Sequence, residues 1–187
     1  MPILARELDL FPEDLLEQQG LGQEADKRWW AIYTKSRHEK ELMRRLCGLN
    51  IAFYTPLIAR RRRSPGGRIR TAYVALFAGY VFLYGNESDR CCALGTNCVS
   101  RCLHVSDGVE LTRDLRQIHR LIESGAPLTP EARLDPGVGV RVRSGPLAGI
   151  EGVVIKRAGA TRLQIAVNFL QKGASLLLED TEVERLD

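Results

Sequence analysis

The alternation of apolar and polar residues over the last 51 residues, 137–187, restricts the fold of this chain more than any other feature. A period of two residues is typical of β-strands with one buried face. Turn sequences rich in glycine separate the alternating runs, which contain Val140/Val142, Val153/Ile155, Leu163/Ile165/Val167 and Leu176/Leu178. Four or five short strands in so few residues bury enough apolar surface only by curling into a small barrel.

A segment without periodicity precedes these strands. Residues 123–136 contain Pro127, Pro130 and Pro136 and no regular apolar pattern, which predicts a linker. The sequence therefore predicts two domains, 28–122 and 137–187. Residues 1–27 are acidic and end in a polar run, and we interpret them as a mobile N-terminal extension.

The segment 28–122 mixes helical and strand patterns, so the predicted fold class is α+β. A capping box formed by Ser36 and Glu39 predicts the start of a helix that ends near Asn50. Asn86 or Ser88 is predicted to cap a short helix through Leu94. Strands are expected at 29–33, 51–57, 73–84 with an interruption at Gly79, and 99–105, followed by a helix over 111–122.

Positive charge is concentrated in one part of the chain. Residues 28–82 hold 12 basic and 2 acidic side chains, whereas residues 1–27 hold 2 basic and 7 acidic ones. A turn sequence, Ser64-Pro65-Gly66-Gly67, predicts a hairpin whose strands carry Arg60, Arg61, Arg62, Arg63, Arg68 and Arg70. Adjacent arginines repel one another, and phosphates relieve that repulsion, so we predict a nucleic-acid contact. The alternative is a merely solvated hairpin.

A second basic group surrounds the first predicted helix. It contains Lys35 and Arg37, which we assign to the same nucleic-acid interface, together with Lys40, Arg44 and Arg45. Helix solubility explains these side chains nearly as well. The acidic extension 1–27 could lie across the basic hairpin as an autoinhibitor, in which case its deletion would strengthen DNA association.

The chemistry of an enzyme is hard to find in this sequence. Its 3 histidines have no nearby nucleophile, and no paired carboxylates can be defended as a catalytic site. Four of its 5 cysteines lie between residues 91 and 102, namely Cys91, Cys92, Cys98 and Cys102. Their spacing argues against zinc because no C-x-x-C pair is present. We predict that these cysteines are small buried hydrophobic residues, and the remaining alternative is that they sense redox conditions. We predict no metal and no cofactor.

The sequence also bears on the compartment. No stretch approaches the roughly 18 uncharged apolar residues that span a bilayer, and the N-terminus lacks the basic and apolar regions of a signal peptide. We therefore expect a cytoplasmic protein without membrane contact. An odd number of cysteines agrees with reduced thiols.

Several short motifs follow one another along the chain. Residues 29–40 read WWAIYTKSRHEK, residues 53–56 read FYTP, residues 76–82 read LFAGYVF, and residues 139–154 read GVRVRSGPLAGIEGVV. In combination they resemble the bacterial NusG-type transcription elongation and antitermination factors over about residues 28–187. The last motif resembles the KOW element of that family. The unusual extension 1–27 suggests a specialised paralogue.

The resemblance implies a fold and a set of contacts. The N-terminal NGN domain would be an α/β sandwich, an antiparallel sheet with flanking helices, and the KOW domain an SH3-like β-barrel. An apolar surface for the clamp helices of RNA polymerase would fall on Tyr33, Tyr80, Phe82 and Val105, and a second polymerase contact on Cys91 and Cys92. The basic hairpin would contact upstream or non-template DNA.

The barrel would recruit a second factor. By resemblance this is a ribosomal small-subunit protein or a termination factor, and Phe169 and Leu170 are the expected contacts, with core packing as the alternative. We expect a monomeric, non-enzymatic factor that reduces pausing or termination. The rival interpretation is a KOW-type RNA- or ribosome-binding protein that acts independently of polymerase.

Overall fold

The computed structural model describes residues 6–63, 65–178 and 183–186, and it leaves the Arg62 side chain undescribed. The chain divides into two compact units, Met1–Gly108 and Val109–Asp187. The helix expected at 111–122 is thereby grouped with the second unit, whereas the sequence pattern assigned it to the N-terminal domain. Among the described residues, no helix has the length and hydropathy needed to cross a membrane.

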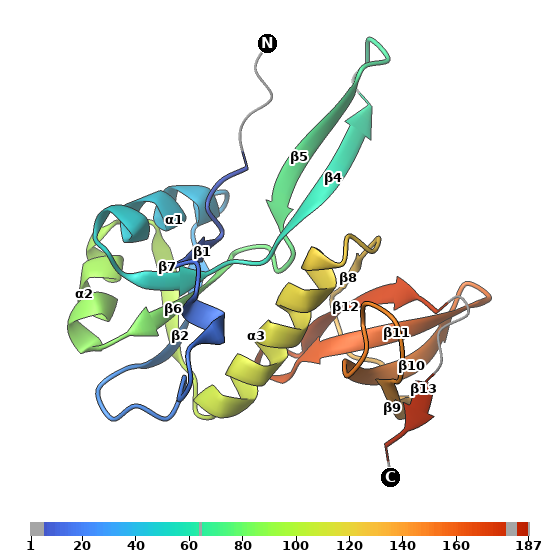
Figure 1. The fold of residues 1–187 in the computed structure, drawn as a ribbon. Helices are drawn as coiled ribbons and strands as arrows, with labels where there is room; N and C mark the ends of the chain where they lie inside the picture. The colour runs from blue at the N-terminus through green and yellow to red at the C-terminus, as the bar shows by residue number, and fades with distance from the viewer. Residues whose placement is uncertain (1–5, 64, 179–182, 187) are drawn as a thin grey trace. The chain divides into compact units, whose positions relative to one another are not determined.

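The first unit is built on a five-stranded antiparallel sheet, which can be followed in Figure 1. Its strands, in spatial order, are β1 (Leu10–Phe11), β3 (Ala52–Tyr54), β6 (Tyr80–Gly85), β2 (Arg28–Thr34) and β7 (Val99–His104). Two helices, α1 (Glu39–Gly48) and α2 (Glu87–Gly95), pack on one face. Trp30 and Ile32 of β2 point to that face and join Leu42 and Leu46 of α1 in the core.

The two helices begin differently. Asn86 caps α2 as predicted, because its side chain accepts from the Asp89 N–H while the Asp89 carboxylate accepts from the Asn86 N–H, both at 2.9 Å. The predicted capping box of α1 is wrong. Its N-cap is His38, whose side chain makes no capping hydrogen bond, and Glu39 instead accepts from the Gly79 N–H.

The expected mobile extension packs onto the first unit over residues 6–27, a segment we call the strap. Its strand β1 pairs with β3, placing Leu10 opposite Tyr54 and Phe11 opposite Phe53. A 3₁₀ turn, Leu15–Glu17, follows, and the side chains of Leu15, Leu16 and Leu21 are buried. The burial of these leucines stabilises the packing of the strap on the first unit, so the strap is not a free tail. Residues 1–5 lie outside the described part.

A separate two-stranded sheet consists of β4 (Leu57–Arg63) and β5 (Ile69–Ala75) and confirms the predicted hairpin. Figure 1 shows it extending away from the five-stranded sheet. Leu57 and Ile58 are buried at its base, whereas β5 is exposed from Ile69 to Ala72. The predicted strand 73–84 is therefore two strands, β5 and β6, because Gly79 (φ +83°) lies in the turn between them.

The second unit contains α3 (Gly108–Glu123) and an antiparallel six-stranded sheet. The strand order is β13 (Val183–Arg185), β9 (Val138–Val142), β10 (Glu151–Arg157), β11 (Ala160–Val167), β12 (Lys172–Leu177) and β8 (Thr129–Glu131). The period-two runs therefore form strands as predicted. Strand β8 lies within the expected linker, where the buried Glu131 accepts from the Ser175 hydroxyl at 2.5 Å and pairs with Arg157.

Helix α3 is held on this sheet by polar side chains. The buried Asp114 carboxylate accepts from the Asn168 N–H at 2.9 Å, and the Gln117 side chain accepts from the Glu151 N–H at 2.7 Å. Arg120 donates to the Ala148 carbonyl at 2.6 Å. Three successive turns of α3 thus bind backbone groups of the second unit, which explains its grouping there.

Candidate functional site

Two tyrosines form an open aromatic pair on the sheet face opposite α1 and α2. Tyr33 of β2 and Tyr80 of β6 are directly opposite in the register, and their ring centroids lie 5.1 Å apart. Tyr33 is 40% exposed and Tyr80 is half-buried. Both therefore have the exposure that a docking residue needs.

The other two predicted docking residues lie beneath the surface. Phe82 is fully buried on the central strand β6, and its ring packs edge-on against Phe77 at 6.4 Å. Val105 is also buried, just after β7. Neither side chain is available at this surface, because both are buried in the first unit.

The structure adds two residues that the sequence interpretation missed. Arg101 of β7 lies opposite Tyr33 in the register, and Leu103 lies opposite Ala31, so both share the face of the tyrosines. Leu103 is 38% exposed. These two residues are two positions apart in a predicted strand, and this spacing could have indicated that they share a face. We call Tyr33, Tyr80, Arg101 and Leu103 the aromatic face.

The opposite end of this sheet face is covered by the strap. The Tyr84 hydroxyl accepts from the Gly22 N–H at 3.3 Å and donates to Glu24 at 3.0 Å, while its ring lies 5.0 Å from that of Trp29. Burial raises the pKa of Tyr84, so the hydroxyl stays protonated and able to donate. The strap thus covers the end that carries Tyr84, whereas Tyr33 and Tyr80 lie at the other end.

Gly79 supports the aromatic pair from the preceding turn. Its carbonyl accepts from the Thr34 N–H at 2.7 Å, and its own N–H donates to Glu39 at 2.8 Å. A Cβ atom at this position would lie 2.7 Å from Cε2 of Tyr33. A glycine is required here both for its left-handed backbone and for its contact with the tyrosine ring.

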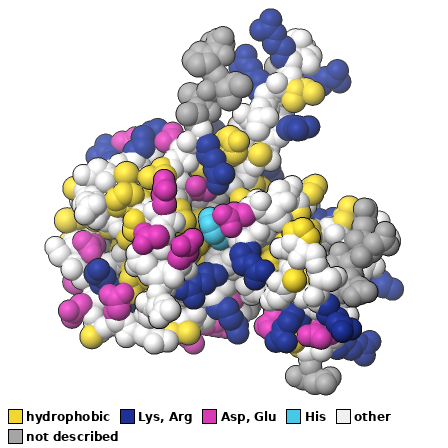
Figure 2. Space-filling model, viewed as in Figure 1, with side chains coloured by type: hydrophobic (Ala, Val, Ile, Leu, Met, Phe, Trp, Pro, Cys, Tyr) yellow, Lys and Arg dark blue, Asp and Glu magenta, His cyan; other side chains and the backbone are white. Residues whose placement is uncertain are grey.

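The basic hairpin presents its arginines to solvent. Arg60, Arg61, Arg63, Arg68 and Arg70 are all exposed, and none of them has an ion pair with a described acidic side chain. Figure 2 shows Lys and Arg side chains gathered over the projecting hairpin. The Arg62 side chain lies outside the described part of the chain. The predicted charge run therefore forms an exposed cationic arm.

The second basic group is divided among local partners. The Lys35 ammonium donates to Asn97 at 2.6 Å, whereas Arg44 pairs with Glu7 of the strap and with Glu41. Arg45 also pairs with Glu41, and hydrogen bonds from Arg45 and Arg44 lower the pKa of that carboxyl. Arg37 is exposed with a left-handed backbone, φ 63°. The group is less free to bind phosphate than the hairpin.

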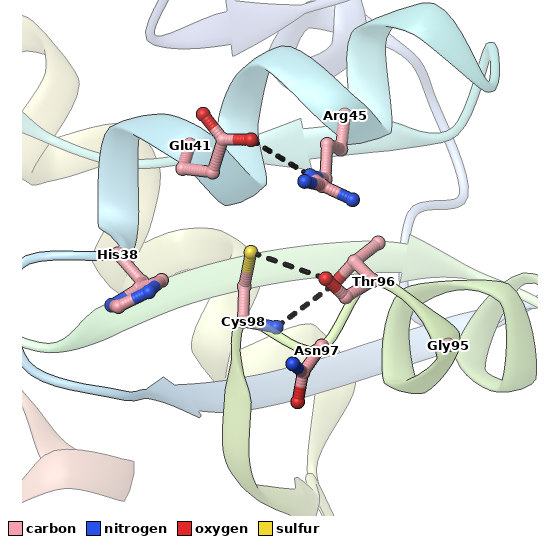
Figure 3. Close-up of a pocket in the computed structure, with 7 residues that line it drawn as sticks. All are labelled: His38, Glu41, Arg45, Gly95, Thr96, Asn97 and Cys98. Atoms are coloured by element: carbon pink, nitrogen blue, oxygen red, sulfur yellow. Dashed lines mark hydrogen bonds and ion pairs between the residues drawn. The ribbon is translucent and has the colours of Figure 1, made fainter.

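A pocket of about 470 Å³ opens between α1 and the turn that joins α2 to β7 (Figure 3). Polar groups from both elements line it, namely His38, Glu41, Arg45, Gly95, Thr96, Asn97 and Cys98. Its one arginine is engaged by Glu41, and the Cys98 thiol donates to the Thr96 carbonyl at 3.5 Å. In the described residues, no group of three or more His, Cys, Asp or Glu side chains could hold a metal ion.

The cysteines do not form a single buried cluster. Only Cys98 is fully buried, Cys102 and Cys47 are intermediate, and Cys91 and Cys92 are exposed on α2. The prediction of small buried hydrophobes is therefore wrong for Cys91 and Cys92. Burial raises the pKa of the Cys102 thiol, which keeps it protonated.

In the second unit, Phe169 and Leu170 lie in a 3₁₀ turn, Asn168–Leu170, and both are half-buried. Helix α3 holds the first residue of this turn. The Asn168 N–H donates to Asp114, and its side-chain amide donates to Glu110 at 3.1 Å. The two expected partner contacts thus lie in a turn that α3 fixes.

Comparison with known proteins identifies the family. A family model described as transcription termination factor NusG matches residues 27–130, more than half of the chain. A Pseudomonas aeruginosa protein named transcription termination/antitermination protein NusG is 26% identical over 180 residues, which cover 86% of this chain and 99% of the relative. The match begins at residue 27, the last residue of the strap. The chain belongs to the NusG family of transcription factors.

Proposed function

We propose that this protein is a transcription elongation factor that binds RNA polymerase across its cleft and reduces pausing or termination. The observation that carries the proposal is the open tyrosine pair Tyr33–Tyr80, which lies on the strand ends of a NusG-family domain. No covalent chemistry is required. A factor that binds the closed clamp more tightly than the open clamp shifts that equilibrium towards the closed state.

The aromatic face suits an amphipathic helical partner such as the clamp helices. Tyrosine rings supply a large apolar contact area, and their hydroxyls tolerate the wet rim of an interface. Arg101 lies beside Tyr33 in the register and adds a cation to this rim. In this proposal Phe82 and Val105 support the surface from below, and the exposed Cys91 and Cys92 contact a second part of polymerase.

The hairpin arginines support a contact with upstream or non-template DNA, to which Lys35 and Arg37 contribute from the region of α1. The second unit supports recruitment of another factor. Its strands β9 to β12 pair in sequence order, which supports the proposed KOW barrel, and Phe169 and Leu170 offer half-exposed apolar surface beside them. A ribosomal small-subunit protein or a termination factor is the proposed partner. The factor would act as a cytoplasmic monomer.

Co-purification of RNA polymerase tests this proposal. The tagged wild type should retain cognate polymerase, and a Tyr33→Ala/Tyr80→Ala variant should lose it. Leu177→Ala, which removes an exposed apolar side chain from the second unit, is the matched control and should behave as wild type. Circular dichroism of each protein establishes that it is folded.

Two outcomes contradict the proposal. Retention of polymerase by the folded double variant would remove the aromatic face as its docking site. Retention of RNA or ribosomes without polymerase by the wild type would move the function to the alternative, a KOW-type RNA- or ribosome-binding protein. Binding to RNA alone would then show a steep salt dependence, approaching one log unit per phosphate.

A further inference from the structure

The hairpin of β4 and β5 carries arginines on both of its faces. Side chains alternate along a strand, and residues opposite each other in an antiparallel pair share a face. Arg60, opposite Ala72, therefore shares one face with Arg70. Arg61, opposite Thr71, and Arg63, opposite Ile69, lie on the other. A ribbon that rests on a flat acidic surface needs cations on one face only.

We infer that this hairpin enters the major groove of double-stranded DNA with its turn foremost, so that each face meets one phosphate backbone. The inference rests on the proposed nucleic-acid contact of the hairpin and specifies its ligand. Sheets with side chains between them pack about 10 Å apart, which sets the thickness of such a ribbon. The major groove is about 12 Å wide and the minor groove about 6 Å, so only the major groove admits it.

The tip of the hairpin suits the floor of that groove. Gly66 and Gly67 lack side chains, and no described atom beyond their chain neighbours lies within 4 Å of a Cβ built at either, so the hairpin is slim at these two residues. Ile69, beside the turn, is 69% exposed. The thymine methyl group is the apolar feature of the major-groove floor, and an open branched side chain matches it.

The hairpin is long enough to reach the floor of the groove, and its base is anchored in the first unit. Strands of seven residues reach about 23 Å, compared with a groove depth of about 8.5 Å. Buried Leu57 and Ile58 anchor its base, and Arg6 of the strap lies over the Tyr73 ring at 5.6 Å. The cations near the tip can therefore reach both walls of the groove while the base remains in the fold.

Matched double variants of the full chain test the geometry. Arg60→Gln/Arg70→Gln removes two charges from one face, and Arg61→Gln/Arg63→Gln removes two charges from the other. Arg143→Gln/Lys156→Gln removes two exposed charges from the second unit and is the control. The probes are a mixed-sequence duplex of about 20 base pairs, two helical turns, and each of its single strands.

We expect the wild type to bind the duplex more tightly than either single strand. Each hairpin double variant should weaken duplex binding by a similar factor, about 10- to 100-fold at 0.1 M salt, and reduce the log–log salt slope by about 1.8. The control should change neither quantity. Ile69→Ala should weaken duplex binding and leave the salt slope unchanged, because it removes an apolar contact.

Several results would overturn the inference. Loss of binding in only one hairpin variant would indicate a one-sided surface, and equal or tighter binding of a single strand would indicate the non-template strand as the ligand. Absence of duplex binding by the wild type would reject double-stranded DNA as the ligand of the hairpin. Polymerase co-purification with the hairpin variants is independent of these results, so retained polymerase with failed duplex binding rejects the groove contact alone.

Discussion

The Asp114 carboxylate on α3 accepts a hydrogen bond from the Asn168 N–H in the second unit at 2.9 Å, and Asp114 is buried. A helix whose sequence pattern assigned it to the N-terminal domain is thereby tied to the turn that carries Phe169 and Leu170. The acceptor that holds the first residue of this turn is therefore more than fifty positions away in the sequence.

Asp114→Ala should destabilise the second unit selectively. Removal of the carboxylate leaves the Asn168 N–H without its acceptor, and such a loss costs about 1–3 kcal/mol. Both tryptophans, Trp29 and Trp30, are in the first unit, so denaturant unfolding followed by tryptophan fluorescence should change little. The far-UV circular dichroism transition should shift to lower denaturant. Lys156→Ala, at an exposed position of the second unit, is the control, and equal transitions for both variants would contradict the role of Asp114.

Leu15→Ala should destabilise the first unit, because the strap is part of its core. Truncation of a fully buried leucine costs about 2–5 kcal/mol. Leu8→Ala removes the same atoms from a strap residue that is 42% exposed and should stay within about 0.5 kcal/mol of wild type. Tryptophan fluorescence during urea unfolding measures both. Similar midpoints for the two variants would restore the interpretation of residues 1–27 as a mobile extension.

Gly79→Ala should disturb the tyrosine pair as well as the turn. The substitution forces alanine into a left-handed backbone, which costs about 1–2 kcal/mol, and it places a Cβ 2.7 Å from Tyr33. Gly67→Ala is a matched control, because its φ is +78° and its Cβ would meet no atom within 4 Å. Both variants should lose stability, but only Gly79→Ala should lose polymerase in the co-purification assay. Normal polymerase retention by Gly79→Ala would argue against a docking role for the Tyr33 position.

The cysteines should alkylate in an order set by exposure. Iodoacetamide should modify Cys91 and Cys92 first, because both are exposed on α2. Cys102 should react slowly, since burial raises the pKa of its thiol and the thiolate is the nucleophile. Cys98 is buried and should react last. Mass spectrometry of peptides from a time course of the native protein measures the order, and early modification of Cys98 would show that its surroundings open.

Local periodicity was sufficient for most elements of the fold. The leucine spacing of α1 and the period-two runs of β9 to β12 repeat along the chain with the period of the backbone itself, so neighbouring residues contain the information. The Asn86 capping box and the turn between β4 and β5 are equally local. Motifs within residues 29–154 also sufficed to indicate the family that the comparisons then showed.

Contacts between residues distant in the sequence decided which strand and helix faces are buried. Tyr33, Tyr80 and Phe82 share one face, and their sequence spacing cannot separate them, yet Phe82 is buried against Phe77 while Tyr33 is open. Strand β8 also escaped prediction, since its three residues carry no period and are held by pairing with β12. The sequence by itself determined which side chains share a face, because strand and helix periods are local. Tertiary structure decided which of those faces are buried, because the strap and α3 find their partners only when distant segments meet.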